Sequence, residues 1–382
     1  KANCGGKRVE CSGTQQSPAH STGADQDARN NVQTAISGKV LRVFVCTHGV
    51  IVRSSALNFS GRREPMRDDA RLEDLGGGLF AYLQPDGSWG LSNAGLVSAG
   101  DESLLIDTLY DLPLTQRMLD AMAKATPAAR HIDTLVNTHA NGDHCYGNQL
   151  VSDARIITST ATAEEWDEVP PAVMVAMLDG ADQMGEAGEF LKHAFGAYQF
   201  EGLEPTRPTE TFDGHLDLSV GDTAVELIEV GPAHTRGDVL IYVPGARTIF
   251  TGDILFIEGT PIMWEGPVAN WIDACEKIVA LDPEIIVPGH GPLTDTKGAL
   301  AVRDYLVYIR DEARKRFDAG LSAREAALDI QLGDYSSWLD SERIAVNVVT
   351  LYREFGDTSA PPGPMETFEL MGELSRNARR AR

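Results

Sequence analysis

The sequence predicts a layered α/β domain followed by a helical C-terminal extension. Three observations lead to this prediction. Short apolar runs alternate with segments of helical periodicity between residues 72 and 293, the pattern of strands and helices packed in layers. Turn residues, chiefly Pro, Asp and Gly, separate these runs. From residue 298 onward the apolar residues recur only at helical spacing.

Apolar runs bounded by turn residues predict the strands. The first is GLFAYLQ, and the last, EIIVPGHGP, contains a histidine between two glycines. The predicted strands cover residues 78–84, 92–100, 103–109, 132–140, 155–160, 216–220, 224–230, 239–244, 248–253 and 284–292.

Apolar residues three and four positions apart predict the helices. These helices cover residues 113–124, 162–166, 271–281, 298–318, 322–331 and 341–355. Residues 165–205 form an apolar, helical insertion between two groups of strands. The catalytic domain is expected to span residues 66–297 and the helical C-terminal extension residues 298–382, ending in a charged tail.

The first 65 residues differ in composition from the rest of the chain. They contain nine basic and four acidic residues, whereas the remainder contains 24 basic and 52 acidic residues. The polar run over residues 1–38 is typical of disorder, and residues 40–52 could form a strand without an obvious partner. We expect the fold to begin near Met66, with residues 1–65 a disordered or non-native extension.

Composition narrows the classes of partner. A net charge of −23 argues against nucleic acid and anionic membranes, which attract clustered Lys and Arg. No run reaches the roughly 18 apolar residues of a membrane helix, and no apolar segment typical of a signal peptide is evident in the first 35 residues. The five cysteines form no CxxC pair, which favours a reducing cytoplasm. We therefore expect a cytoplasmic protein with a small-molecule substrate; the oligomeric state stays open.

Four loops at or just beyond the ends of predicted strands contain residue types that can bind metals. They are THANGDH (138–144), PAHTRGD (232–238), TGD (251–253) and PGHGP (288–292). Residues at the ends of neighbouring strands converge even when they are distant in sequence. Imidazole nitrogen and carboxylate oxygen are ligands that zinc and iron accept at neutral pH, so the loops predict a metal site.

These four loops, in this order, resemble the motifs of the metallo-β-lactamase fold superfamily, whose first motif is His-x-His-x-Asp-His. The resemblance covers about residues 72–293. It implies a four-layer αββα sandwich with the metal site at one edge of the two sheets. It also implies a binuclear ligand set: His139, Asn141 and His234 at one metal, Asp143, His144 and His290 at the other, and Asp253 bridging both.

Asn141 departs from the superfamily pattern, because an amide oxygen replaces the second imidazole. An amide oxygen binds zinc less well than imidazole does. Three alternatives follow: two metals with the first held weakly, one metal at the intact second site, or a harder ion such as Fe or Mn that accepts oxygen ligands. The cofactor expected is Zn²⁺, one or two per chain.

The resemblance implies a hydrolase in which hydroxide generated at the metal attacks an ester, thioester, lactone or lactam bond. Asp143 or Asp253 would orient this nucleophile and accept its proton, so both are candidate catalytic residues. The rivals are an iron-dependent oxidoreductase of the same fold and a binding protein that lost catalysis through Asn141.

Four aromatic residues are candidate substrate contacts. Trp264 follows the TGD loop closely, and Trp89 lies in a turn that overhangs the site in many members of the superfamily. Phe190 and Phe195 belong to the apolar insertion, which could cap the site as a lid or pack on the outer layer of the sandwich. The lid alternative predicts a substrate with an apolar or aromatic body.

Overall fold

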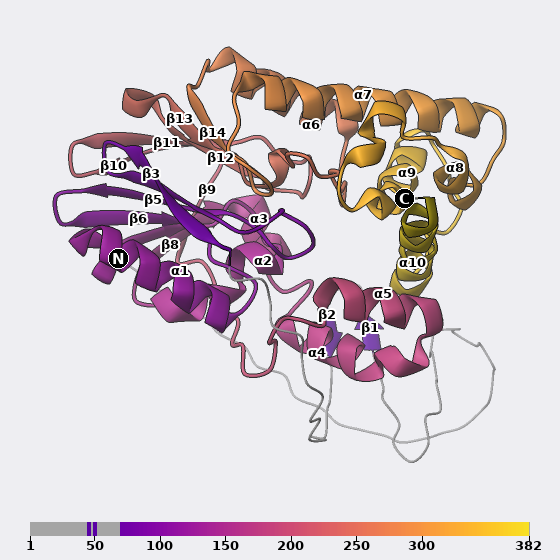
Figure 1. Cartoon of the computed structure of the whole chain (residues 1–382), viewed down its shortest axis with the longest axis horizontal. Coiled ribbons are helices and arrows are strands. Elements are labelled where there is room, and N and C mark those ends of the chain that lie inside the picture. Colours follow the sequence, from indigo (N-terminus) through magenta and orange to yellow (C-terminus); the bar gives the residue numbers. More distant parts are fainter. Residues whose placement is uncertain (1–43, 47–48, 52–68, 382) are drawn as a thin grey trace, which may run out of the picture.

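Two β-sheets pack face to face in the computed structural model, which describes residues 44–46, 49–51 and 69–381 (Figure 1). The seven-stranded sheet runs in sequence order through β3 (Arg71–Gly76), β4 (Leu79–Leu83), β5 (Ala94–Ala99), β6 (Glu102–Ile106), β7 (Thr134–Val136), β8 (Arg155–Ser159) and β9 (Glu210–Phe212). The five-stranded sheet runs through β10 (His215–Val220), β11 (Thr223–Glu229), β12 (Val239–Val243), β13 (Thr248–Phe250) and β14 (Ile285–Val287).

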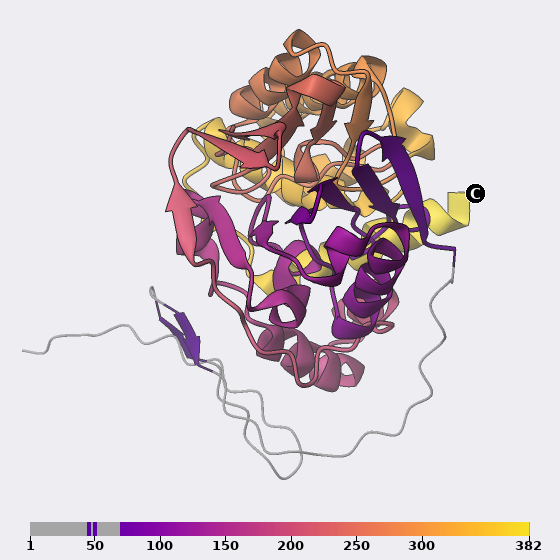
Figure 2. The ribbon, with the colours of Figure 1, turned by 90° about the vertical axis from the view of Figure 1, so that its left-hand side faces the viewer.

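Helices cover the outer faces of both sheets, so the molecule has the four layers of an αββα sandwich (Figures 1 and 2). Helix α1 lies on the seven-stranded sheet, and helices α6 and α7 lie on the five-stranded sheet. The helices are α1 (Leu112–Ala125), α2 (Gly142–Cys145), α3 (Thr160–Glu165), α4 (Pro171–Gly180), α5 (Gly185–Phe195), α6 (Val268–Ala280), α7 (Thr296–Asp318), α8 (Ala323–Asp329), α9 (Ile344–Glu354) and α10 (Pro364–Ala381). The predicted fold class is confirmed.

Strand direction brings the functional loops to one edge of the sandwich. Strands β6 to β9 pair in parallel, and β14 is parallel to β13, whereas the other neighbours are antiparallel. Parallel neighbours require a crossover, which α1 supplies between β6 and β7 and α6 supplies between β13 and β14. The carboxyl ends within each parallel group therefore share one edge of their sheet.

An apolar core between the sheets determines which face of each sheet points inward. On β11, Val225 and Leu227 are fully buried in this core, and Val97 and Leu104 of the opposite sheet belong to the same cluster. The alternate residues of β11, Ala224 and Glu226, are less buried, as expected for a period of two. Each such buried aliphatic side chain contributes about 1.5–3 kcal/mol of transfer free energy.

Several elements differ from the sequence-based expectations. Strands β3 and β9 were not predicted, because β3 is a largely polar edge strand and β9 has only three residues. The predicted strand within residues 40–52 is instead two short strands, β1 (Phe44–Cys46) and β2 (Gly49–Ile51), which pair with each other. The other predictions for residues 1–65 lie outside the described residues. Helix α7 begins at Thr296, so it runs through the expected domain boundary at residue 297.

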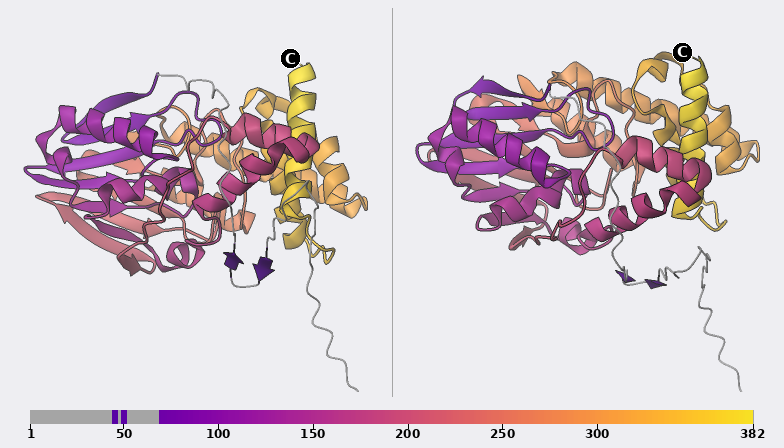
Figure 3. Two further views of the ribbon diagram at one scale, coloured as in Figure 1. Left: turned by 90° about the horizontal axis from the view of Figure 1, so that it is seen from below. Right: turned by 60° about the horizontal axis from the view of Figure 1, so that its bottom comes forward.

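The expected charged tail forms helix α10, which packs against α5 of the insertion and against α9 (Figure 3). The rings of Phe190 on α5 and Phe368 on α10 lie 6.2 Å apart. Arg376 of α10 pairs with Glu186 of α5. The insertion and the C-terminal extension are therefore joined by direct contacts. Among the described residues, every helix is too short or too polar to cross a bilayer.

We expect Met371→Ala to lower the free energy of unfolding by about 2–5 kcal/mol, because Met371 of α10 is fully buried. Met365 lies on the same helix with 39% of its surface exposed, so Met365→Ala is a matched control expected within about 0.5 kcal/mol of the parent. Urea denaturation measures both changes. Equal effects in the two variants would show that α10 does not stabilise the fold through its buried face.

Candidate metal centre

Four loops place their ligand-type side chains at one edge of the sandwich. The loop 138–144 follows β7, the loop 232–238 follows β11, and the loops 251–253 and 288–292 follow β13 and β14. Their four histidines, His139, His144, His234 and His290, are each at most 3% exposed. The loops identified in the sequence therefore meet in one buried cluster.

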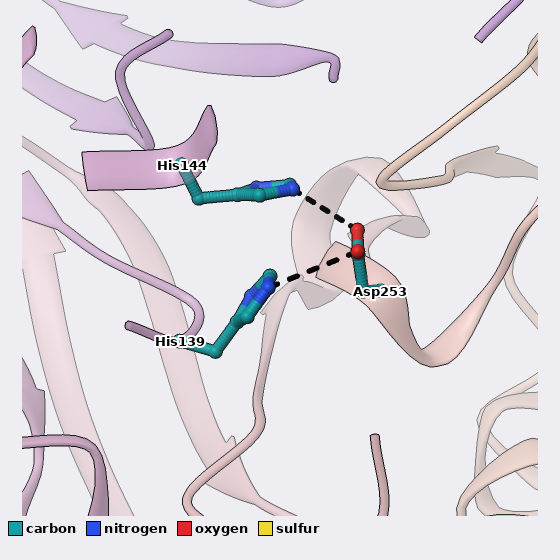
Figure 4. A group of neighbouring side chains, drawn as sticks. All are labelled: His139, His144 and Asp253. Carbon is teal, nitrogen blue, oxygen red and sulfur yellow. Dashed lines mark ion pairs between the residues drawn. The ribbon is translucent and has the colours of Figure 1, made fainter. Parts of the chain in front are cut away.

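Asp253 lies at the centre of this cluster. Its Oδ1 atom is 3.0 Å from Nε2 of His144, and its Oδ2 atom is 3.8 Å from Nε2 of His139 (Figure 4). The same Oδ2 lies 3.4 Å from Nε2 of His234 and 3.5 Å from Nε2 of His290. A single carboxylate thus faces four imidazoles, the arrangement that the bridging assignment requires.

Two overlapping groups of donor atoms could hold a metal ion. His139, His144 and Asp253 form one group, and Asp143, His144 and His290 form the other; within each, the donor atoms lie within 4.8 Å of one another. Asp143 Oδ2 is 3.4 Å from His290 Nε2. His144 therefore belongs to both groups, whereas the resemblance to the superfamily implies that it binds the second metal alone.

Asn141 lies at the N-terminus of α2, where its backbone oxygen accepts a hydrogen bond from the amide of His144 at 2.9 Å. Asn141 is half-buried, and its side-chain amide makes no hydrogen bond within the described residues. The amide is therefore not committed to a structural contact at this position.

Backbone carbonyl groups fix the tautomers of two histidines. His234 Nδ1 lies 2.6 Å from the carbonyl oxygen of Ile262, and His290 Nδ1 lies 3.0 Å from that of Gly87. A carbonyl oxygen can only accept, so each Nδ1 carries the proton and donates. In the neutral ring, Nε2 is then the nitrogen without a proton, and in both residues it faces Asp253.

Asp107 fixes the other two histidines, and the sequence analysis did not identify it. Its Oδ2 accepts from Nδ1 of His144 at 2.9 Å and from the hydroxyl of Thr138 at 2.8 Å. Because that hydroxyl proton points to Asp107, Thr138 Oγ1 accepts from Nδ1 of His139 at 2.9 Å. The backbone of Asp107 has φ +60°, and the residue directly follows β6. The predicted strand 103–109 included Asp107, whereas β6 ends at Ile106 and leaves Asp107 at the edge that carries the cluster.

The buried donor atoms fit a metal ion. Nε2 of His139, His144 and His234 and Oδ1 of Asp253 are buried and form no hydrogen bond of normal geometry within the described residues. Leaving such atoms unpaired is unfavourable by about 1–3 kcal/mol each. His139, His144 and Asp253 bring two imidazole nitrogens and a carboxylate oxygen within 4.8 Å of one another, and His234 Nε2 lies 3.4 Å from the same carboxylate. Imidazole and carboxylate are ligands that zinc, iron or manganese accepts.

The electrostatics of the cluster favour bound positive charge. Burial alone would raise the pKa of Asp253, but His290 and His144 hold it well below its usual 3.8. Burial lowers the pKa of His234 to about 4, whereas Asp253 and Asp143 overcome burial and raise the pKa of His290 to about 9. Asp253 is therefore ionised at neutral pH, the form that binds a metal cation.

The four candidate substrate contacts differ in exposure. Trp264 is 37% exposed, and its backbone amide donates to the carbonyl of His234 at 3.0 Å. Phe190 and Phe195 are 2% and 6% exposed. Both rings contact Trp89 edge to face, at centroid distances of 5.9 and 5.5 Å. The two phenylalanines therefore present almost no surface to a substrate in this structure, which favours packing over a lid, while Trp264 stays accessible beside the centre.

Comparison with known proteins gives consistent matches. Residues 87–290 match the profile of the Metallo-beta-lactamase superfamily. The chain is 30% identical over 271 residues to 2,4-dinitroanisole O-demethylase subunit alpha from Nocardioides sp. (strain JS1661), an alignment that covers 68% of this chain and 67% of that protein. It is 34% identical over 100 residues to hydroxyacylglutathione hydrolase from Brucella ovis (strain ATCC 25840 / 63/290 / NCTC 10512), which covers 25% of this chain and 38% of the hydrolase.

Among solved structures, the stereoselective inverting sec-alkylsulfatase Pisa1 from Pseudomonas sp. is similar with a TM-score of 0.56. The sequence identity is 16%, and the match covers 76% of this chain and 51% of the sulfatase. This likeness concerns the fold alone. The chain thus spans about half of the sulfatase and less than half of the hydroxyacylglutathione hydrolase.

Proposed function

The chain belongs to the metallo-β-lactamase superfamily, and we propose that it is a metal-dependent hydrolase of a small, apolar substrate. The observation that carries the proposal is the convergence of buried, unpaired imidazole Nε2 atoms on Asp253. His139, His144, His234, His290, Asp143 and Asp253 would hold one or two Zn²⁺ ions, with Asn141 completing the first site. When bound, the metal would lower the pKa of water toward about 7 and polarise the scissile bond.

In this proposal, residues of the chain orient the metal ligands, accept the proton and contact the substrate. Asp253 keeps the imidazoles in place through its two oxygens, which lie 3.0–3.8 Å from four Nε2 atoms. The side chain of Asp143 is 15% exposed, more than those of the clustered histidines, so it can reach both the cluster and an incoming water. We assign proton acceptance to Asp143 and substrate contact to Trp264 beside His234.

Two substrate classes are proposed. The first is an ester, thioester, lactone or lactam, supported by the resemblance to a hydroxyacylglutathione hydrolase. The second is an aryl methyl ether, supported by the relative named as a 2,4-dinitroanisole O-demethylase subunit, which aligns over most of this chain. Exposed Trp264 suits the apolar or aromatic body of either substrate.

The test is a substrate panel assayed on the full chain after metal removal and reloading with Zn²⁺, Fe²⁺ or Mn²⁺. The panel contains acyl esters of increasing chain length, a thioester, a lactone, a lactam and 2,4-dinitroanisole. Turnover with zinc supports hydrolysis, whereas activity confined to the iron-loaded protein together with consumption of oxygen would replace the hydrolase by an oxidoreductase. No turnover with any metal would favour a binding protein.

Asn141→His is expected to raise the zinc content toward two ions per chain. The substitution supplies the imidazole that the superfamily motif has at this position, and no hydrogen bond of the native side chain is lost within the described part of the chain. Elemental analysis after dialysis measures the stoichiometry, with Asn141→Ala as the control that removes the amide without adding a ligand. A zinc content unchanged by the histidine would show that residue 141 does not face the metal.

A further inference from the structure

His290 is oriented by residues outside its own loop. Its Nδ1 donates to the carbonyl of Gly87 at 3.0 Å, and its ring stacks on Phe256 with centroids 5.0 Å apart and planes at 8°. Gly87 has φ +70°, and a Cβ atom there would lie 2.2 Å from the amide nitrogen of Gly291. The turn that contains Gly87 is therefore in direct backbone contact with the loop that carries His290.

Trp89, two residues after Gly87, is held by the C-terminal extension. Its indole Nε1 donates to Oε1 of Glu342 at 2.8 Å. The guanidinium of Arg343 lies 4.4 Å from the centroid of the Trp89 ring and 5.1 Å from that of Phe256. Arg343 thus contacts both Trp89, whose turn binds His290 Nδ1, and Phe256, on which the His290 ring stacks.

The segment that carries these two residues is anchored beside the metal centre. Arg343 Nη1 donates to the carbonyl of Thr260 at 3.0 Å, and its Nη2 lies 2.9 Å from Asp340 Oδ2. The amide of Thr260 donates to the carbonyl of Leu339 at 2.9 Å. Glu342 and Arg343 are 5% and 2% exposed. Removal of one buried charged group from its partner is destabilising by about 3–5 kcal/mol, so the metal affinity of variants at these positions is compared only in folded protein.

We propose that Glu342 and Arg343 are positioning residues, which fix the His290 imidazole through Trp89 and Phe256 and thereby set the metal affinity of the group that contains Asp143. The inference rests on the proposed function, because it assumes that this group holds a metal. It assigns part of the metal centre to residues beyond 290, outside the region that matches the superfamily profile. Groups that orient metal-binding histidines change metal affinity by about 10- to 100-fold when removed.

The experiment compares zinc affinity of the full chain and its variants by competition with a chromophoric chelator, with the Co²⁺ absorption spectrum as a second readout. Glu342→Leu, Arg343→Met and Trp89→Phe should each weaken zinc binding about 10- to 100-fold and alter the Co²⁺ spectrum. Glu342→Gln keeps an oxygen acceptor for the indole and should restore affinity to within about threefold of the parent, as expected for conservative rescue. Arg324→Met is the matched control, since Arg324 belongs to the same extension but pairs with Glu373, and its zinc affinity should not change.

His290→Ala separates failure of the inference from failure of the proposed function. If His290→Ala leaves zinc affinity unchanged, the proposed metal centre is wrong. If His290→Ala weakens zinc binding while folded Glu342→Leu, Arg343→Met and Trp89→Phe retain the parent affinity and spectrum, the positioning role is overturned and the metal centre stands. Should Arg343→Met fail to fold, as judged by circular dichroism, the other two variants decide the outcome.

Discussion

Asp253→Ala is expected to lower kcat/KM by at least about a thousandfold, equivalent to about 4 kcal/mol of barrier, and to release the bound metal. Among the carboxylates that the structure describes, Asp253 alone lies within 4 Å of the Nε2 atoms of all four clustered histidines, at 3.0–3.8 Å. Alanine removes the charge that offsets a dication and leaves the imidazoles without their common anion. The measurements are steady-state kinetics on the best substrate of the panel and elemental analysis of the same preparation.

Two controls separate charge from shape at this position. Asp253→Asn keeps the size and one oxygen but removes the negative charge, so its activity and metal content should stay close to those of the alanine variant. Asp222 is an exposed residue of the β10–β11 turn, and Asp222→Ala should change neither the activity nor the metal content. Retention of full metal and activity in Asp253→Ala would rule out a bridging role.

Asp107→Ala is expected to lower zinc affinity about 10- to 100-fold and the free energy of unfolding by about 3–5 kcal/mol. The carboxylate is 2% exposed and accepts from the amide of Thr138 at 2.7 Å as well as from its hydroxyl and from His144. Without it, the Nδ1 proton of His144 loses its acceptor and the ring can change tautomer or rotate. Chelator competition measures the first effect and urea denaturation the second.

Asp133 provides the matched control for Asp107. Asp133 precedes β7 and accepts hydrogen bonds from the amide and hydroxyl of Ser103 on β6. It therefore links the amino ends of β6 and β7, whereas Asp107 links the carboxyl ends of the same two strands. Asp133→Ala should cause a smaller loss of stability, because its side chain is 45% exposed, and no change in zinc affinity. A similar loss of zinc affinity in both variants would mean that Asp107 acts through general stability alone.

The loops of the candidate metal centre could be identified from the sequence because their signals are local. His139, Asp143 and His144 share one seven-residue loop, and His234, Asp253 and His290 lie in loops that follow recognisable strands. Asp107 was missed because the predicted strand 103–109 included it, and only the tertiary fold brings it to His144. The partner of His234, the carbonyl of Ile262, has no side-chain signal at all.

The helices show what the spacing of apolar residues can and cannot predict. The spacing of apolar residues predicted helices in the insertion, but it could not identify the surface that covers them. Phe190 packs on Phe368, which is nearly 180 positions away and belongs to a helix that ends in basic residues and resembled a charged tail. Because this contact is long-range, periodicity alone could not choose between a lid and a packed layer.

Burial of the candidate metal centre has a consequence for the rate of metal exchange. The histidines at the centre are 0–3% exposed, and each Nδ1 is already bound to a neighbouring group, so the rings cannot turn outward one by one. An ion held there must leave through the side of Asp143 or wait for a transient opening of the loops. Metal removal by a chelator should then reach a limiting rate that further chelator does not increase, and an ion of modest equilibrium affinity would still have a long residence time in the protein.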